Sequence, residues 1–146
     1  MNEQQRAEQV RALMLSDDAA SRMLGIAIIE VSPGRAVARM TVRPDMLNGF
    51  GICHGGLIAT LADSAFAFAC NSRNALTVAS GFGIDIVKSA KAGEVLTATA
   101  SETSLAGRTG LYDVEVRNQD DLLIAAFRGR SYRLGERRVF DEGGDE

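Results

Sequence analysis

The chain has 146 residues, of which 46% are hydrophobic and 24% are charged, and its formal net charge is −3. This length fits one domain with a core of its own, and so small a charge argues against binding to nucleic acid or to an anionic membrane surface. Two cysteines are too few for a disulfide framework. Since the sequence shows neither a secretory signal nor an apolar run of membrane-span character, a cytoplasmic location is expected.

The first 24 residues are expected to form a helical segment. Apolar residues recur at helical spacing within residues 3–15, and Ser16-Asp17-Asp18 can end that helix or cap a further turn over residues 19–24. From Gly25 the period changes to that of strands, over residues 26–31 and 35–42, with Ser32-Pro33-Gly34 as the turn between them. The pattern predicts a two-stranded hairpin after the N-terminal helix.

One long helix is expected from His54 to about Asn71. It is apolar nearly all round, which is typical of a buried helix. Between residues 46 and 72 the only formally charged side chain is Asp63. Because burying an unpaired carboxylate is costly, such a group is usually paired, protonated or used in chemistry, and desolvation would raise its pKa toward the range useful in proton transfer.

The second half of the chain is expected to contain four strands, over residues 77–88, 94–105, 109–118 and 122–133. Tyr112, Val114 and Val116 alternate with charged residues, so that strand should have one buried and one wet face. Short connections favour antiparallel hairpins, and the central helix needs a sheet to cover it. The predicted fold class is α+β, a curved antiparallel sheet wrapped around one long helix. We expect a single domain over residues 1–136 and a disordered tail over residues 137–146.

A glycine-rich loop precedes the long helix and supplies the second half of a candidate site. Gly49 and Gly51 make this loop flexible. Gly55 and Gly56 follow His54 in the first helical turn, where backbone N–H groups lack acceptors and, with the helix dipole, suit an oxyanion or a polarised carbonyl. The segment therefore combines a lone carboxylate with a set of oxyanion donors.

The motif Asn48-Gly49-(four residues)-His54-Gly55-Gly56, followed by Leu61-Ala62-Asp63, resembles the signature of hotdog-fold acyl-CoA thioesterases of the phenylacetic-acid degradation (PaaI-type) family. The likeness extends over about residues 20–134. It implies a hotdog fold and an enzyme that hydrolyses an acyl-CoA thioester, with aryl-acetyl-CoA favoured, to a free carboxylic acid and CoA. It implies no cofactor, because coenzyme A is part of the substrate.

The resemblance also implies roles for the residues of the motif. Asp63 would act as general base on water or as nucleophile, in either case in its ionised form. The Gly55 N–H would be the oxyanion donor, with His54 holding the carbonyl and Asn48 assisting its position. The residues alone leave other interpretations open, since Asp63 could be a structural carboxylate satisfied by neighbouring hydroxyl or backbone donors, and His54 could simply cap the helix.

Four further residues are weaker candidates for substrate binding. Ser80, or alternatively Thr77 near the start of the same strand, matches a region where related enzymes place a hydroxyl near the catalytic water. Gly56 would let a substrate approach the backbone. Phe66 and Phe82 could line an acyl pocket, although the default for such residues is the core. His54 is the sole histidine of the chain, which excludes the usual His-rich metal sites, and no metal is expected.

Two rival functions remain open from the sequence. A hotdog enoyl-CoA hydratase or dehydratase uses the same residue types to move protons, and a non-catalytic acyl-CoA-binding protein would share the fold. Release of free thiol from an acyl-CoA distinguishes thioester hydrolysis from both of these alternatives.

Helix geometry bears on the assembly. Asp63 lies nine residues after His54, which is roughly 13 Å along a helix and half a turn around it, so the two cannot meet on one helix. A second copy related by a two-fold axis can supply the missing donors. We therefore expect a homodimer whose sites are shared across the interface, Asp63 coming from one chain and Asn48, His54 and Gly55 from the other. The resemblance implies that such dimers usually pair into a homotetramer.

Overall fold

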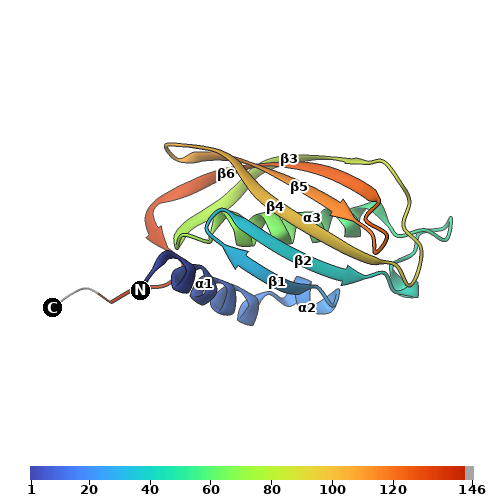
Figure 1. The fold of residues 1–146 in the computed structure, drawn as a ribbon, viewed down its shortest axis with the longest axis horizontal. Coiled ribbons are helices and arrows are strands. Elements are labelled where there is room, and N and C mark those ends of the chain that lie inside the picture. The colour runs from blue at the N-terminus through green and yellow to red at the C-terminus, as the bar shows by residue number, and fades with distance from the viewer. Residues whose placement is uncertain (144–146) are drawn as a thin grey trace.

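A computed structural model describes residues 1–143 of the chain (Figure 1). Two helices come first, α1 (Glu3–Asp17) and α2 (Ala19–Met23), followed by the hairpin of β1 (Ala27–Ser32) and β2 (Arg35–Thr41). A 3-10 turn, η1 (Pro44–Met46), leads through the glycine-rich loop into α3 (Gly55–Cys70). The remaining elements are four strands, β3 (Ala75–Ile86), β4 (Val95–Ala106), β5 (Thr109–Arg117) and β6 (Leu123–Arg138). The predicted order of elements is confirmed, with boundaries that differ by a few residues.

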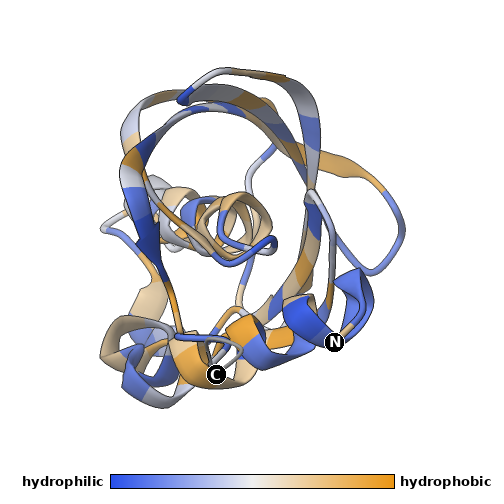
Figure 2. Cartoon of the chain, turned by 90° about the vertical axis from the view of Figure 1, so that its left-hand side faces the viewer, coloured by the Kyte–Doolittle hydropathy of each residue, from blue (hydrophilic) through white to orange (hydrophobic). Residues whose placement is uncertain are grey.

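The six strands form one antiparallel sheet in the order β1-β2-β4-β5-β6-β3. The sheet curves around α3, which fills the hollow of the curve in the end-on view (Figure 2). The alternation along β5 is as predicted, because Tyr112, Val114 and Val116 are buried in the core. The predicted α+β architecture, a hotdog arrangement of sheet around one long helix, is confirmed.

The long helix α3 is buried on one side only. Its buried residues pack against the sheet and include Ile58, Leu61, Ala62, Ala65 and Phe66. The opposite side, which carries Gly56, Thr60, Asp63 and Ala67, is not fully covered, because a single curved sheet does not surround the helix. Within residues 1–143, no helix has both the length and the apolar character of a membrane span.

β3 forms an uncovered edge of the sheet. It is 12 residues long, it stands last in the strand order, and Val78, Phe82 and Ile86 along it are each more than 40% exposed. The other edge, β1, is covered by α1, whose Gln4 and Arg11 side chains donate hydrogen bonds to its backbone carbonyls. Because a long apolar edge strand tends to pair with another edge, β3 is the side of the sheet suited to a partner.

The C-terminal segment is fixed further along the chain than the sequence predicted. β6 continues to Arg138, so residues 137 and 138 of the expected tail belong to the sheet. Beyond the strand, the side-chain amide of Asn74 bonds to both the C=O and the N–H of Phe140, each at 2.9 Å. Arg6 of α1 forms an ion pair with Glu142 at 2.5 Å. These long-range contacts hold residues 139–142 against the body of the domain, and residues 144–146 lie outside the described part of the chain.

Candidate active site

The first turn of α3 is organised by His54. This residue is the N-cap of the helix, and its Nδ1 accepts a hydrogen bond from the N–H of Gly56 at 3.2 Å. Its own backbone N–H donates to the carbonyl of Met46 at 2.8 Å. An accepting Nδ1 carries no proton, so the neutral imidazole has its hydrogen on Nε2. The capping interpretation of His54 is confirmed, and it leaves the Nε2–H of this exposed side chain as a donor for a ligand.

Gly55 contributes the open backbone donor of the same turn. Its N–H has no acceptor among residues 1–143, whereas the N–H of Gly56 is taken by His54. Donors at a helix N-terminus carry partial positive charge, so this N–H is suited to an oxyanion. A Cβ at position 55 would lie 2.8 Å from Cδ1 of Ile86. A larger residue at position 55 would therefore force the end of the Ile86 side chain to move, so glycine lets the helix begin close to the end of β3.

Asn48 shapes the glycine-rich loop before the helix. Its Oδ1 accepts hydrogen bonds from the N–H groups of Phe50 at 2.9 Å and Ile52 at 3.4 Å, and its own N–H donates to the carbonyl of Ile52 at 2.8 Å. Gly51 has a φ of 76°, in the left-handed region that favours glycine. The amide oxygen of Asn48 is thus used inside the loop, which leaves its Nδ2 group as the part that could assist a substrate carbonyl.

Asp63 lies half-buried on the open side of α3, and its carboxylate has no hydrogen-bond or ion-pair partner among the described residues. The two nearest hydroxyls on the helix are used elsewhere. Thr60 Oγ1 donates to the carbonyl of Gly56 at 2.9 Å. Ser64 Oγ lies 3.2 Å from Ser21 Oγ. Ser21 donates its own hydroxyl proton to the carboxylate of Asp18, the N-cap of α2, so Ser64 must be the donor in the Ser64–Ser21 pair. The structural alternative for Asp63, a carboxylate satisfied by these hydroxyls, is therefore not what the structure shows.

The electrostatic surroundings favour a protonatable carboxylate. Burial in an apolar setting raises the pKa of Asp63 above its usual range. Burial, together with the nearby charge of Asp63, raises the pKa of the Cys70 thiol to about 12. Burial likewise raises the pKa of Cys53, so the cysteine next to His54 is a protonated packing residue. Asp63 is therefore a partly buried carboxylate whose pKa is raised toward the range useful to a general base.

A cavity of about 380 Å³ opens beside Asp63. Helix α3 contributes Asp63, Phe66 and Ala67 to its lining, and β3 contributes residues 76–79. Cys70 and Asn71 at the end of α3, Met14 of α1 and Val139 after β6 complete the lining. The lining is mainly apolar and contains one carboxylate, that of Asp63. The cavity is therefore suited to bind an apolar group next to this carboxylate.

The position of β3 at this cavity is set by Asn71. The Asn71 side chain is buried just after α3, and its Nδ2 donates to the carbonyl of Thr77 at 3.0 Å while its Oδ1 accepts from the N–H of Thr77 at 2.9 Å. The same Nδ2 also bonds to the carbonyl of Ala67 at 2.9 Å. The end of α3 and the start of β3 are thus tied together at the edge of the Asp63 cavity.

The structure brings only part of the predicted site together within one chain. Asp63 and Phe66 line one cavity, while His54 and Gly55 lie at the opposite end of β3, beside Ile86. The Ser80 hydroxyl donates to the carbonyl of Arg130 at 3.2 Å and does not line the Asp63 cavity. Phe82 is also outside that cavity, where it stacks on the ring of Phe127 at 4.9 Å. The wall residues Met14, Leu76 and Val139 were not anticipated, since their apolar character alone does not show what they face.

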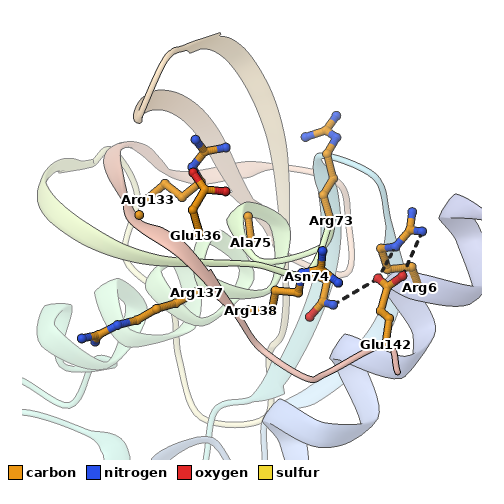
Figure 3. Close-up of a pocket in the computed structure, with 10 residues that line it drawn as sticks. Arg6, Arg73, Asn74, Ala75, Arg133, Glu136, Arg137, Arg138 and Glu142 are labelled. Carbon is orange, nitrogen blue, oxygen red and sulfur yellow. Dashed lines mark hydrogen bonds and ion pairs between the residues drawn. The ribbon is translucent and has the colours of Figure 1, made fainter. Parts of the chain in front are cut away.

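A second recess, next to the end of β6, is lined by five arginines, Arg6, Arg73, Arg133, Arg137 and Arg138, of which the first two form ion pairs. Arg6 is paired with Glu142, and Arg73 forms an ion pair with Glu102. Arg73 and Arg137 point away from each other in the close-up view (Figure 3). The described residues also contain no group of three or more His, Cys, Asp or Glu side chains that could hold a metal ion.

Comparison with known proteins agrees with this geometry. The sequence model of the family described as the thioesterase superfamily matches residues 50–125. The chain is 48% identical to the acyl-coenzyme A thioesterase PaaI of Escherichia coli over 122 residues, which cover 84% of this chain and 87% of that protein. The structure of the E. coli PaaI protein from the phenylacetic acid degradation operon has a TM-score of 0.91 at 44% identity, covering 93% of this chain and 99% of that chain. A Streptococcus mutans protein bound to acetyl CoA has a TM-score of 0.74 at 26% identity, covering 77% and 91%. The chain belongs to the thioesterase superfamily and has the hotdog fold.

Proposed function

We propose that this protein hydrolyses the thioester bond of an acyl-CoA to a free carboxylic acid and CoA, with aryl-acetyl groups favoured. The observation that carries this proposal is Asp63, a carboxylate without a partner among residues 1–143, at an apolar cavity on the open side of α3. The names of the relatives support it, since one is an acyl-CoA thioesterase from a phenylacetic acid degradation operon and another binds acetyl CoA. A reducing cytoplasm suits the free, buried thiols of Cys53 and Cys70.

Two chemical routes use Asp63, and both need its ionised form. As general base, the carboxylate takes a proton from water while the water oxygen bonds to the thioester carbonyl carbon, and the C–S bond then breaks as the CoA sulfur takes up a proton. As nucleophile, a carboxylate oxygen attacks the carbonyl carbon and expels CoA, and water hydrolyses the resulting anhydride. In either route the carbonyl oxygen becomes negative and is stabilised by N–H donors at the start of α3.

A shared site across a dimer follows from the two ends of β3. In one chain, Gly55 packs beside Ile86 at the end of β3, whereas the Asp63 cavity is lined by residues 76–79 near its start. If two copies pair antiparallel through their free β3 edges, the end of each strand meets the start of the other. The partner's Gly55 is then brought toward the Asp63 cavity, which a single chain does not achieve.

The apolar edge supports this arrangement physically. Val78, Phe82 and Ile86 are exposed along β3, and pairing would remove them and the open side of α3 from water. The proposed unit is therefore a homodimer with two equivalent sites. Pairing of two such dimers into a homotetramer is part of the same proposal and rests on the family likeness.

The test is release of free thiol from acyl-CoA substrates by the purified protein. We expect thiol release in step with formation of the free carboxylic acid, and loss of both in Asp63→Asn. Hydration of an enoyl-CoA without thiol release would instead show a hydratase. Tight binding of acyl-CoA with no chemical change would show a binding protein.

A further inference from the structure

We propose that α1 and the C-terminal segment set the size limit of the acyl group, through Met14 and Val139 at the far wall of the Asp63 cavity. This inference rests on the proposed function, because it identifies the acyl-binding end of the same site. Met14 and Val139 are both partly exposed apolar residues that line the cavity containing Asp63. They lie outside residues 50–125, the part of the chain that the family's sequence model matches. The wall is thus a feature of this chain's terminal segments and not of the matched family core.

The inner and outer sides of the cavity have different origins. The inner side is built from the central helix and β3, with Asp63 and Phe66 from α3 and Leu76 at the start of β3. The outer side comes from α1 and the segment that follows β6, which lie near each other at one end of the molecule (Figure 1). An acyl group that fills this cavity from a carbonyl carbon beside Asp63 would contact Met14 and Val139, which line the same cavity.

This outer wall is held in place by specific contacts. Asn74 bonds to the backbone of Phe140 in both directions, and its Nδ2 also lies 3.1 Å from Oε1 of Glu142. Arg6 of α1 bonds to both carboxylate oxygens of Glu142, at 2.5 and 3.3 Å (Figure 3). The segment that carries Val139 and the helix that carries Met14 are therefore tied to each other and to the turn before β3.

The cavity volume indicates which acyl groups fit. A cavity of about 150 Å³ accommodates benzene, so a cavity of about 380 Å³ holds an aryl-acetyl group or an aliphatic chain of moderate length. The unbranched, flexible side chain of Met14 can adapt to different apolar shapes. We therefore infer a pocket that takes aromatic and medium-length apolar acyl groups and excludes long ones by contact with this wall.

The experiment compares acyl-CoA substrates that share CoA and differ only in the acyl group, from phenylacetyl-CoA to straight-chain acyl-CoAs of increasing length. Met14→Ala and Val139→Ala enlarge the cavity, and Met14→Phe narrows it. Leu13→Ala is the matched control, because Leu13 is exposed on α1 and does not line the cavity. Ratios of kcat/KM between long and short acyl groups cancel effects on the CoA contacts and on the reacting groups.

A methylene in an apolar pocket changes such a ratio by about tenfold or more. Each enlarging variant should therefore raise the ratio for longer acyl groups by about tenfold, Met14→Phe should lower it to a similar degree, and Leu13→Ala should leave it unchanged. An equal loss of kcat/KM across the whole series, or ratios that match the parent in folded variants, would overturn the proposed wall. If Met14→Ala does not fold, Val139→Ala and Met14→Phe provide the same comparison.

A binding measurement separates this inference from the proposed function. Dissociation constants for the same acyl-CoAs are measured with Asp63→Asn alone and with Asp63→Asn combined with each wall variant. These constants should rank the acyl lengths in the same order as kcat/KM does in the corresponding catalytically active proteins. A parent that shows this order in binding but releases no thiol would contradict the proposed function and support the wall. A parent that releases thiol with a preference unaffected by Met14 and Val139 would contradict the wall alone.

Discussion

Asp63→Asn is the substitution with the clearest expected effect on rate. The amide has almost the shape of the carboxylate, but it can neither take a proton from water nor attack the carbonyl carbon. No other carboxylate or imidazole from the described residues lines the cavity, and Cys70 stays protonated at neutral pH because its pKa is raised to about 12. With no substitute base, we expect kcat to fall by about 100- to 10,000-fold. This corresponds to about 2.7 to 5.4 kcal/mol of transition-state stabilisation, at about 1.36 kcal/mol per factor of ten.

The same substitution should raise the stability of the protein at neutral pH. Burial raises the pKa of Asp63 in the folded state, so the folded protein binds this proton more tightly than the unfolded chain does. Stability in the parent therefore falls as pH rises from the usual range of an aspartate through the raised folded value. Asp63→Asn removes this loss, because the amide carries no charge at any pH.

Two assays measure how Asp63→Asn changes the rate and the stability relative to the parent protein. Thiol release from a fixed acyl-CoA measures the rate, and thermal unfolding followed at several pH values measures Tm. We expect the variant to have the higher Tm at neutral pH and the gap to close in acid, where both states of the parent are protonated. A rate within about threefold of the parent, less than about 1 kcal/mol of barrier, would remove Asp63 from the mechanism. A variant that is less stable at neutral pH would show that the carboxylate has a structural partner.

Three further changes test the parts around this group. In the parent, kcat/KM should fall as pH drops through a value above the usual range of an aspartate, because the raised pKa of Asp63 governs its ionisation; an acid limb at the usual aspartate value would contradict the assignment. Gly129→Ala places a Cβ 2.8 Å from the ring of buried Phe66, so it should cost about 1–3 kcal/mol of stability, whereas Gly49→Ala, with open space around it, should not. Asn71→Ala removes the amide that bonds the backbone N–H and C=O of Thr77 at the start of β3, and it should lower stability by about 1–3 kcal/mol. Denaturant unfolding measures the stability of the Gly129→Ala and Asn71→Ala variants.

The elements that follow local rules could be predicted from the sequence. Alternation of Tyr112, Val114 and Val116 with charged residues defined the buried face of β5, because strand periodicity is a property of neighbouring residues. The start of α3 was visible for the same reason, since His54 followed by two glycines marks a helix N-terminus with open donors. Asp63 was found because it is the one charged side chain in an apolar helix.

The features that depend on distant contacts could not be predicted. Met14 and Val139 lie 125 positions apart, and their apolar character does not show that they meet at one cavity. Residues 139–142 have the composition of a tail, yet the Asn74 amide and the Arg6–Glu142 pair fix them in place. Local sequence patterns carry no information about such partners, because each contact requires the whole fold to be formed.

The shared site is the central claim, and a mixed dimer tests it directly. Chains carrying Asp63→Asn and chains carrying His54→Ala are given different tags, shown to be folded and inactive alone, and purified together as heterodimers. If each site takes Asp63 from one chain and the helix-start donors from the other, one site of the mixed dimer carries both lesions and the other carries neither. The heterodimer should then recover about half of the parental activity per dimer. A heterodimer as inactive as the two mutant homodimers would show that base and donors belong to the same chain.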